Sequence, residues 1–370
     1  MSLREISVPA RLLPLQVLEQ ARQGDREPLA RLTIAVLAFA LLCTMAVSLS
    51  SGALSISLTA VFQGFADGTD ADPSALRDRI VMMEVRLPRV VLGALVGASL
   101  AVSGAVMQGL FRNPLADPGI VGVSAGAGLG AAAMIVLGGT FLAPVVQLAG
   151  IYALPLAAFL GGLATTFALY RIGTRDGMTS VATMLLAGIA LGALAGAITG
   201  LLVYVADDQQ LRDLTFWGLG SLAGATWEKV LTAGPIIAVV LLGVPFLANG
   251  LNALFLGEAA AGHLGIRVQR LKSIAIVAVA AATGASVAVS GGIGFVGIVV
   301  PHLLRLTIGP DHRYLLPACA LLGASMLILA DTVSRIIVAP AELPIGILTA
   351  LAGAPFFLWI LLRRKGLVQA

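Results

Sequence analysis

Long apolar runs follow one another along almost the whole chain, each about as long as a helix that crosses a lipid bilayer. Inside the hydrocarbon core the backbone polar groups must be hydrogen-bonded within their own segment, so each run is expected to form a helix of about 20 residues. The eighth run is short and rich in glycine, so we expect it to be broken or tilted. Ten runs can be read, at residues 32–50, 88–107, 119–139, 148–171, 179–205, 228–249, 271–290, 292–308, 313–333 and 344–362.

The charge content agrees with a chain that faces lipid. Only 11% of the residues are charged and the mean hydropathy is +0.99, whereas an ordinary soluble domain is about 25% charged. The net charge of +4 is interpreted as loop charges that meet anionic lipid headgroups, not as a nucleic-acid-binding surface. No short apolar core with a cleavage site precedes Arg31, so residues 1–31 are expected to be an N-terminal extension of a ten-helix transmembrane domain at 32–370.

Lysines and arginines are distributed unevenly between the two sets of loops. Ten spans place both chain ends on one side, and the loops on that side hold 16 of the 23 basic residues. The side richer in lysine and arginine is expected to be cytoplasmic. Both termini are therefore predicted inside, and the long connection at 51–87 outside.

One octapeptide occurs twice. Residues 97–104 read GASLAVSG and residues 284–291 read GASVAVSG, which match at seven of eight positions. By the predicted topology the first copy runs inward and the second runs outward, so the two halves of the chain would be inverted repeats, a recurrent transporter architecture. The alternative is a chance likeness between two segments rich in alanine and glycine.

Small residues also recur at four-residue spacing, as in Gly93 and Gly97. This spacing favours close helix association. The longer series on run 179–205 allows a second interpretation, in which the small residues line a translocation path. That series consists of Gly188, Gly192, Gly196 and Gly200.

Motifs for chemistry within the chain are weak. No G-x-x-x-x-G-K-[ST] sequence is present, so the chain is not expected to hydrolyse a nucleotide. The G-x-S-x-G at 122–126 is interpreted as a packing motif, because a nucleophile elbow needs a histidine base and an acid. The three histidines, His263, His302 and His312, are too scattered for a metal site. His302 is read as an interfacial or capping residue.

Ionisable residues inside the apolar runs are few, which argues against a proton-driven carrier. Asp331 has Arg335 four residues on, and the spacing predicts an ion pair on one helix face. Arg86 stands just before the second run and Arg89 at its start, and the two are either interfacial anchors or docking sites for acidic side chains. An interrupted amphipathic pattern over 250–270 predicts a short cytoplasmic helix that contacts the membrane surface or a soluble partner.

Several segments together carry a family resemblance: RLPRVVLGALVGASLAVSGAVMQGLFRNPLADPGIVGVSAGAG, FWGLGSLAGATW, LGEAAAGHLGIRVQR, GGIGFVGIVVPHLLRLTIGPDHR, and ADTVSR followed by AELPIGILTALAGAPFFLWILLRR. The chain resembles the permease subunits of bacterial ABC importers of the vitamin B12, ferric siderophore and haem family (FecCD-type), with the haem importers as the nearest subgroup. The segments lie in order and with family-like spacing at 86–128, 216–227, 256–270, 291–313 and 330–364.

The resemblance implies an all-α polytopic fold, the type II ABC importer permease, with ten transmembrane helices in two inverted halves. It implies a homodimer in the inner membrane with the path on its axis, two cytoplasmic ATPases and a periplasmic binding protein. No cofactor is implied for this chain, since ATP and Mg bind to the partner ATPase. Carried onto this sequence, the ATPase-coupling residues are Glu258, His263, Leu264, Gly265 and Arg267, and the binding-protein contacts are Arg86, Arg89 and Arg335.

The function expected from this resemblance is ATP-driven import of haem or a similar iron chelate. Cobalamin or a ferric siderophore is the alternative substrate on the same scaffold. Two other classes stay open, an ion-coupled secondary transporter and an intramembrane hydrolase that uses Ser124.

Overall fold

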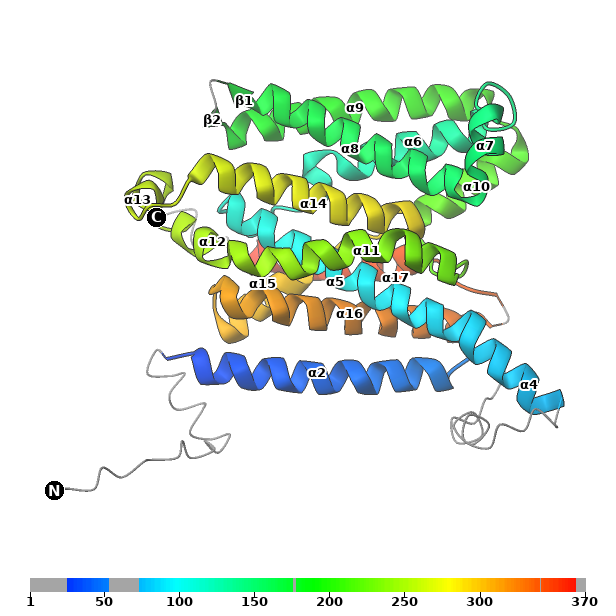
Figure 1. The fold of residues 1–370 in the computed structure, drawn as a ribbon, viewed down its shortest axis with the longest axis horizontal. Helices are drawn as coiled ribbons and strands as arrows, with labels where there is room; N and C mark the ends of the chain where they lie inside the picture. The colour runs from blue at the N-terminus through cyan, green and yellow to red at the C-terminus, as the bar shows by residue number, and fades with distance from the viewer. Residues whose placement is uncertain (1–24, 53–72, 176–177, 340, 364–370) are drawn as a thin grey trace.

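The computed structural model describes residues 25–52, 73–175, 178–339 and 341–363. The described chain is almost entirely helical, apart from one two-stranded antiparallel hairpin (Figure 1). Most of the predicted extension at 1–31 and much of the connection at 51–87 lie outside the described residues. The elements are α2 (Glu27–Ser50), α4 (Pro73–Ile80), η1 (Val81–Arg86), α5 (Leu87–Leu110), η2 (Pro118–Val121), α6 (Val123–Leu137), α7 (Ala143–Ala149), η3 (Gly150–Tyr152), α8 (Ala153–Gly173), β1 (Thr174–Arg175), β2 (Met178–Thr179), α9 (Val181–Val205), α10 (Asp208–Leu219), α11 (Trp227–Gly243), η4 (Val244–Leu247), α12 (Ala248–Leu254), α13 (Glu258–His263), α14 (Val268–Ser290), α15 (Val296–Ile308), α16 (His312–Ile337) and α17 (Ile345–Arg363).

Every predicted apolar run overlaps a helix. Within the described residues, seven helical stretches are long and apolar enough to cross a membrane. The third, eighth and tenth runs fall on shorter apolar helices, at Val123–Leu137, Val296–Ile308 and Ile345–Trp359. The all-α polytopic fold is confirmed, while ten complete crossings stay a prediction.

The eighth run is broken, as its glycine content predicted. Its first residues are not helical, and α15 begins only at Val296. Gly291 has φ +70°, and a Cβ there would lie 2.1 Å from the Trp217 carbonyl oxygen. Phe295 is also left-handed, with φ +68°. A helix cannot pass through left-handed residues, so α14 ends before Gly291 and the helix of the eighth run starts only after Phe295.

The second run extends further than the sequence predicted. Residues 73–86 were expected to belong to a loop, but α4 and the π-helical turn η1 lead without a break into α5. Pro88 lacks an N–H group and its ring crowds the carbonyl one turn earlier, which a normal α-helix does not tolerate. The wider turn before it, in which the Leu87 N–H bonds to the Met82 oxygen, accommodates the proline.

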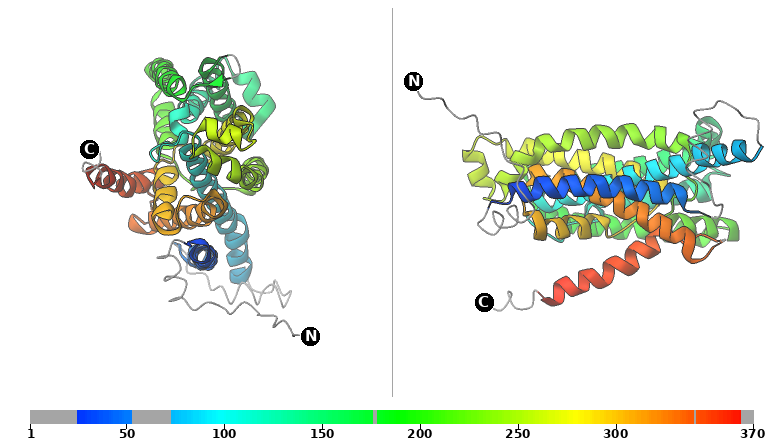
Figure 2. Two further views of the ribbon diagram at one scale, coloured as in Figure 1. Left: turned by 90° about the vertical axis from the view of Figure 1, so that its left-hand side faces the viewer. Right: turned by 90° about the horizontal axis from the view of Figure 1, so that it is seen from below.

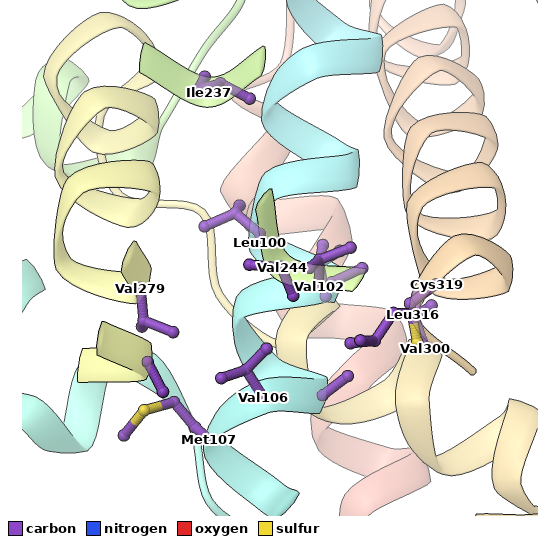
Figure 3. Close-up of a cluster of buried hydrophobic side chains, with 14 of the residues drawn as sticks. Leu100, Val102, Val106, Met107, Ile237, Val244, Val279, Val300, Leu316 and Cys319 are labelled. Atoms are coloured by element: carbon purple, nitrogen blue, oxygen red, sulfur yellow. The ribbon is translucent and has the colours of Figure 1, made fainter. Parts of the chain in front are cut away.

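Helix α5 forms the centre of the bundle. It is buried without interruption from Val96 to Leu110 and contacts α11, α14, α15 and α16. Figure 3 shows apolar side chains of four helices meeting there, among them Val106, Val279, Val300 and Leu316. Figure 2 shows α2 at one edge of the bundle and α17 leaning away from it.

The two octapeptide copies lie against each other. They belong to α5 and α14, which run in opposite directions (Figure 1) and are in contact. Ser99 and Ser286 hold the same position in the two copies, and their hydroxyls are hydrogen-bonded at 2.9 Å. Contact between equivalent positions of antiparallel helices is what a two-fold relation produces, so the structure favours inverted repeats over a chance likeness.

The two predicted sets of loops lie at opposite ends of the helix bundle. In Figure 1 the start of α2, the β-hairpin, α12, α13 and the end of α17 lie at one end, which we call the hairpin end. The described part of α4, α7 and the start of α11 lie at the other, which we call the α7 end.

Candidate functional site

The short helix predicted at 250–270 is present at the hairpin end as α13. Gly257, with φ +102°, and Gly265, with φ +82°, stand on either side of it, and both conformations favour glycine. Leu256 and Leu264 are 70% and 64% exposed. The residues predicted for ATPase coupling that stay exposed are His263, Leu264, Gly265 and Arg267. Together these form an uncovered surface, which we call the α13 surface.

Glu258, the fifth predicted coupling residue, is already engaged within the chain. Its carboxylate pairs with the Lys272 ammonium at 2.8 Å. Lys272 is buried and also donates to the Thr179 carbonyl oxygen at 3.0 Å. This arrangement joins α13 to α14 and to the β-hairpin, so Glu258 positions the helix. The spacing of Glu258 and Lys272, 14 residues apart, does not predict this pairing.

Helix α12, which leads into α13, is held to the start of α16. The Asn252 amide donates to Asp311 at 2.7 Å, and its oxygen accepts from the His312 backbone N–H at 2.9 Å. Burial alone would raise the pKa of Asp311. Hydrogen bonds from the Arg313 side chain and backbone and from Asn252 outweigh that effect and lower the pKa to about 2. The α13 surface therefore has a second attachment, to the transmembrane core.

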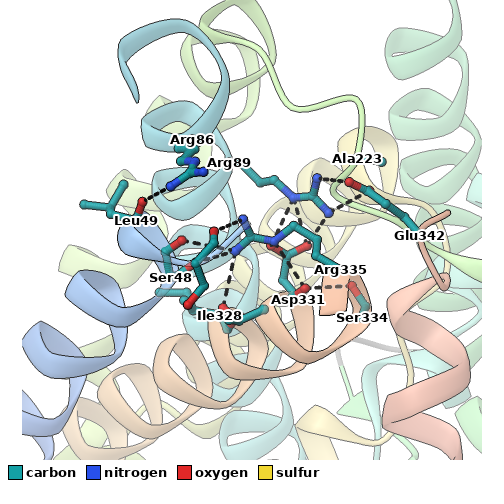
Figure 4. A network of polar contacts seen from close by, with 12 residues as sticks. Ser48, Leu49, Arg86, Arg89, Ala223, Ile328, Asp331, Ser334, Arg335 and Glu342 are labelled. Atoms are coloured by element: carbon teal, nitrogen blue, oxygen red, sulfur yellow. Dashed lines mark hydrogen bonds and ion pairs between the residues drawn. The ribbon is translucent and has the colours of Figure 1, made fainter. Parts of the chain in front are cut away.

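The α7 end holds a network of buried charges (Figure 4). Arg89 donates to Asp331 at 2.8–3.0 Å and to both oxygens of Glu342 at 2.9–3.0 Å. Arg335 pairs with Asp331 at 3.2 Å and reaches the Ser48 hydroxyl at 2.8 Å. The network connects α2, α5, α16 and the segment before α17.

The three arginines predicted to contact a binding protein are not exposed. Arg86 and Arg89 are 5% and 6% exposed, and Arg86 donates to the Leu49 carbonyl oxygen at 2.6 Å. The i,i+4 pair between Asp331 and Arg335 is confirmed. The bonds from Arg89 to Asp331 and Glu342 were missed, because no local spacing indicates a contact across 242 and 253 residues.

The glycine series on α9 does not serve packing within this chain. A Cβ at Gly192, Gly196 or Gly200 would meet nothing within 4 Å, whereas Gly188 is buried. Gly192 and Gly196 line a groove of about 450 Å³ together with residues of α6 and α10, including Trp217. We call this the α9 groove.

Two smaller predictions have different outcomes. The G-x-S-x-G motif does pack, because a Cβ at Gly126 would lie 2.1 Å from the Thr165 hydroxyl. His302 neither caps a helix nor lies at an interface with water. It is buried in the middle of α15, 6.1 Å from Phe356 of α17 in an edge-on ring contact.

Comparison with known proteins gives consistent matches. Residues 40–363 match the FecCD transport family. The hemin transport system permease protein HmuU of Yersinia pestis is 48% identical over 285 residues, covering 77% of this chain and 84% of that protein. The cobalamin import system permease protein BtuC of Halobacterium salinarum is 46% identical over 287 residues, covering 78% and 74%. The vitamin B12 import system permease protein BtuC of Escherichia coli is 43% identical over 311 residues, covering 84% and 91%.

A solved structure extends the match to three dimensions. It shows a metal-chelate type ABC transporter in an inward-facing conformation, with a TM-score of 0.77 and 34% identity, covering 89% of this chain and 98% of that one. The family match runs through the central helix α5, the α13 surface and the buried charge network alike. The chain belongs to the FecCD transport family.

Proposed function

We propose that the chain is the permease subunit of an ATP-driven importer that moves haem or a similar iron chelate from the periplasm to the cytoplasm. The observation that carries the proposal is the uncovered α13 surface, which is attached at Lys272 and at Asp311 to the transmembrane helices. The sequence has no nucleotide-binding motif of its own. Such a permease needs a surface at which a partner ATPase can bind and transmit a movement to the transmembrane helices.

The energy enters through two copies of a separate ATPase that bind ATP and Mg and dock on the α13 surface. This places the hairpin end in the cytoplasm, together with both termini, in a bacterial inner membrane. The richness of that end in lysine and arginine supports the orientation. ATP binding and hydrolysis shift α13, and the shift reaches α14 through Glu258 and Lys272 and α16 through Asn252 and Asp311.

A second copy of the chain completes the path. In one copy α9 has open space beside Gly192, Gly196 and Gly200, and α17 leans away from the bundle (Figure 2). Two copies that face each other through α9 and α17 enclose a path with small residues on its wall. Such a wall offers a large apolar chelate few strong contacts and lets it pass.

A periplasmic binding protein delivers the substrate at the α7 end. Arg86, Arg89 and Arg335 act there by fixing the shape of the docking surface, since their guanidinium groups are already bonded within the chain.

The family resemblance favours haem over cobalamin and a ferric siderophore as the substrate, and an uptake experiment distinguishes the three. The permease is reconstituted in proteoliposomes with its ATPase and its binding protein, and uptake of hemin, cyanocobalamin and a ferric hydroxamate is measured with and without ATP. We expect ATP-dependent uptake of hemin alone. Uptake of cyanocobalamin in place of hemin would replace the proposed substrate.

A further inference from the structure

A cavity of about 420 Å³ opens toward the α7 end, between α8, α10, α11, α14 and the segment before α17. A smaller cavity of about 160 Å³ shares part of its wall, including Pro155, Lys229 and Val289. The volume of the larger cavity falls within the range of small-molecule sites. Its wall is largely apolar and includes the aromatic side chains Phe216 and Trp217.

Two charged side chains, Glu342 and Lys229, line this cavity. Both carboxylate oxygens of Glu342 accept hydrogen bonds from Arg89, which compensates its charge. Among the residues that the structure describes, none forms a hydrogen bond or an ion pair with the Lys229 ammonium. The cavity therefore presents one uncompensated positive charge beside two aromatic rings.

The cavity lies next to the proposed path. Trp217 lines both the cavity and the α9 groove, which it shares with Gly192 and Gly196. The cavity and the groove adjoin at Trp217. The cavity therefore has the position expected of a site that a substrate occupies before it enters the path.

We infer that this cavity recognises a carboxylate on a flat, largely apolar substrate. Lys229 pairs with the carboxylate, and Phe216 and Trp217 cover the apolar body beside it. The inference rests on the proposed function and deepens it, because it requires a substrate with a free carboxylate. Haem has two, on its propionate side chains, whereas the peripheral acid groups of cobalamin are amides.

The test measures binding to the purified full-length permease in nanodiscs, by quenching of tryptophan fluorescence. Hemin is the probe, and hemin dimethyl ester, whose carboxylates are blocked, is its matched control. We expect Lys229→Gln to weaken hemin binding about tenfold, since a charge-assisted hydrogen bond is lost. Lys229→Arg should retain binding, and the ester should bind the unmodified protein as weakly as hemin binds Lys229→Gln.

Two further variants control for location and for general charge. Trp217→Leu should also weaken hemin binding, because it removes one of the two aromatic rings that line the cavity, and the other tryptophans still report binding. Arg212→Gln removes an exposed cation of α10 that does not line the cavity and should leave the affinity unchanged. The inference is overturned if Lys229→Gln binds hemin as tightly as the unmodified protein does, or if Trp217→Leu does so.

The outcome separates this inference from the proposed function. Hemin uptake in proteoliposomes that does not depend on Lys229 leaves the proposed function intact and overturns the cavity site. Lys229-dependent binding of hemin without ATP-driven uptake supports the cavity site and overturns the proposed function. Thermal unfolding of Lys229→Gln checks that a loss of binding does not come from a loss of folded protein.

Discussion

Arg89 connects three separate segments of the chain through hydrogen bonds to two carboxylates. Its guanidinium bonds to Asp331 and Glu342, and Asp331 is 2% exposed and also pairs with Arg335. Charges inside or near a membrane are expensive unless they are paired. The network therefore fixes the relative positions of α5, α16 and the segment before α17.

We predict that Arg89→Ala lowers the free energy of unfolding by about 3–5 kcal/mol, because it leaves the buried Asp331 carboxylate with one cation fewer. Thermal unfolding in detergent measures the loss. Arg77→Ala is the matched control, since Arg77 is largely exposed where it pairs with Asp78, and it should change stability by less than about 1 kcal/mol. Equal melting temperatures for both variants would contradict a structural role for the network.

Because Arg86, Arg89 and Arg335 are bonded within the chain, a change in docking can also result from a loss of folded protein. Reversing the charge at Arg86, Arg89 or Arg335 would put a carboxylate into a buried site and damage the fold itself. Weaker docking of a binding protein counts as a docking effect only in variants whose unfolding temperature is preserved.

Asp311 gives a pH dependence at the opposite end of the bundle. Its pKa in the folded protein is about 2, below the value of about 3.9 expected in an unfolded chain. A depressed pKa means that the carboxylate stabilises the fold above about pH 4 and that this contribution is lost as the pH falls toward 2. We predict a smaller loss of stability between pH 5 and pH 3 in Asp311→Asn than in the unmodified protein, measured by thermal unfolding. Parallel pH profiles for the two proteins would contradict this.

Among the elements, α5 depends on glycine for its close approach to α16. A Cβ at Gly97 would lie 2.3 Å from the carbonyl oxygen of Gly323. Both atoms in that clash belong to or adjoin the backbone, so the two helices would have to separate.

We predict that Gly97→Ala destabilises the protein by about 1–3 kcal/mol, the usual cost of overpacking. Gly196→Ala is the matched control, because it also adds one methyl group in an apolar helix but meets nothing within 4 Å. That variant should be neutral or slightly stabilising, since alanine is the better helix former. Unfolding temperatures of the two variants should therefore differ, and equal values would show that α5 and α16 can move apart at no cost.

The turn after α13 allows a test of the coupling between ATP hydrolysis and transport. Gly265 has φ +82°, a conformation that proline, with φ near −65°, cannot adopt. We predict that Gly265→Pro lowers transport per ATP hydrolysed by about tenfold in the reconstituted complex, as expected when two sites lose their energetic coupling. Gly262→Ala, an exposed change in the same segment with open space around it, should keep the ratio. A normal ratio in Gly265→Pro would remove α13 from the coupling route.

The elements were more predictable from sequence than the contacts between them. Apolar run length located the membrane helices, because the bilayer imposes one length on all of them. The α13 helix was visible through its periodicity. The partners of Glu258 and Arg89 were not, because an ion pair between distant segments leaves no periodic pattern. The burial of Arg86 was missed for the same reason, since the Leu49 carbonyl oxygen that accepts its hydrogen bond lies 37 residues away.

At the scale of the whole molecule, the two halves meet through their matching octapeptides on antiparallel helices, at Ser99 and Ser286. Around this centre the α13 surface, the open face of α9 and much of α17 are exposed in the single chain. The proposed partner of the α13 surface is the ATPase, and the proposed partner of α9 and α17 is the second copy. This arrangement is one of a subunit that works as part of a larger assembly.

We propose that a partner's ATP cycle drives transport through this chain. The most direct measurement is hemin uptake into proteoliposomes that contain the permease, with and without its ATPase, under either ATP or an imposed proton gradient. We predict accumulation only when the ATPase and ATP are both present. Accumulation by the permease alone, driven by the proton gradient, would contradict the claim and identify a secondary transporter.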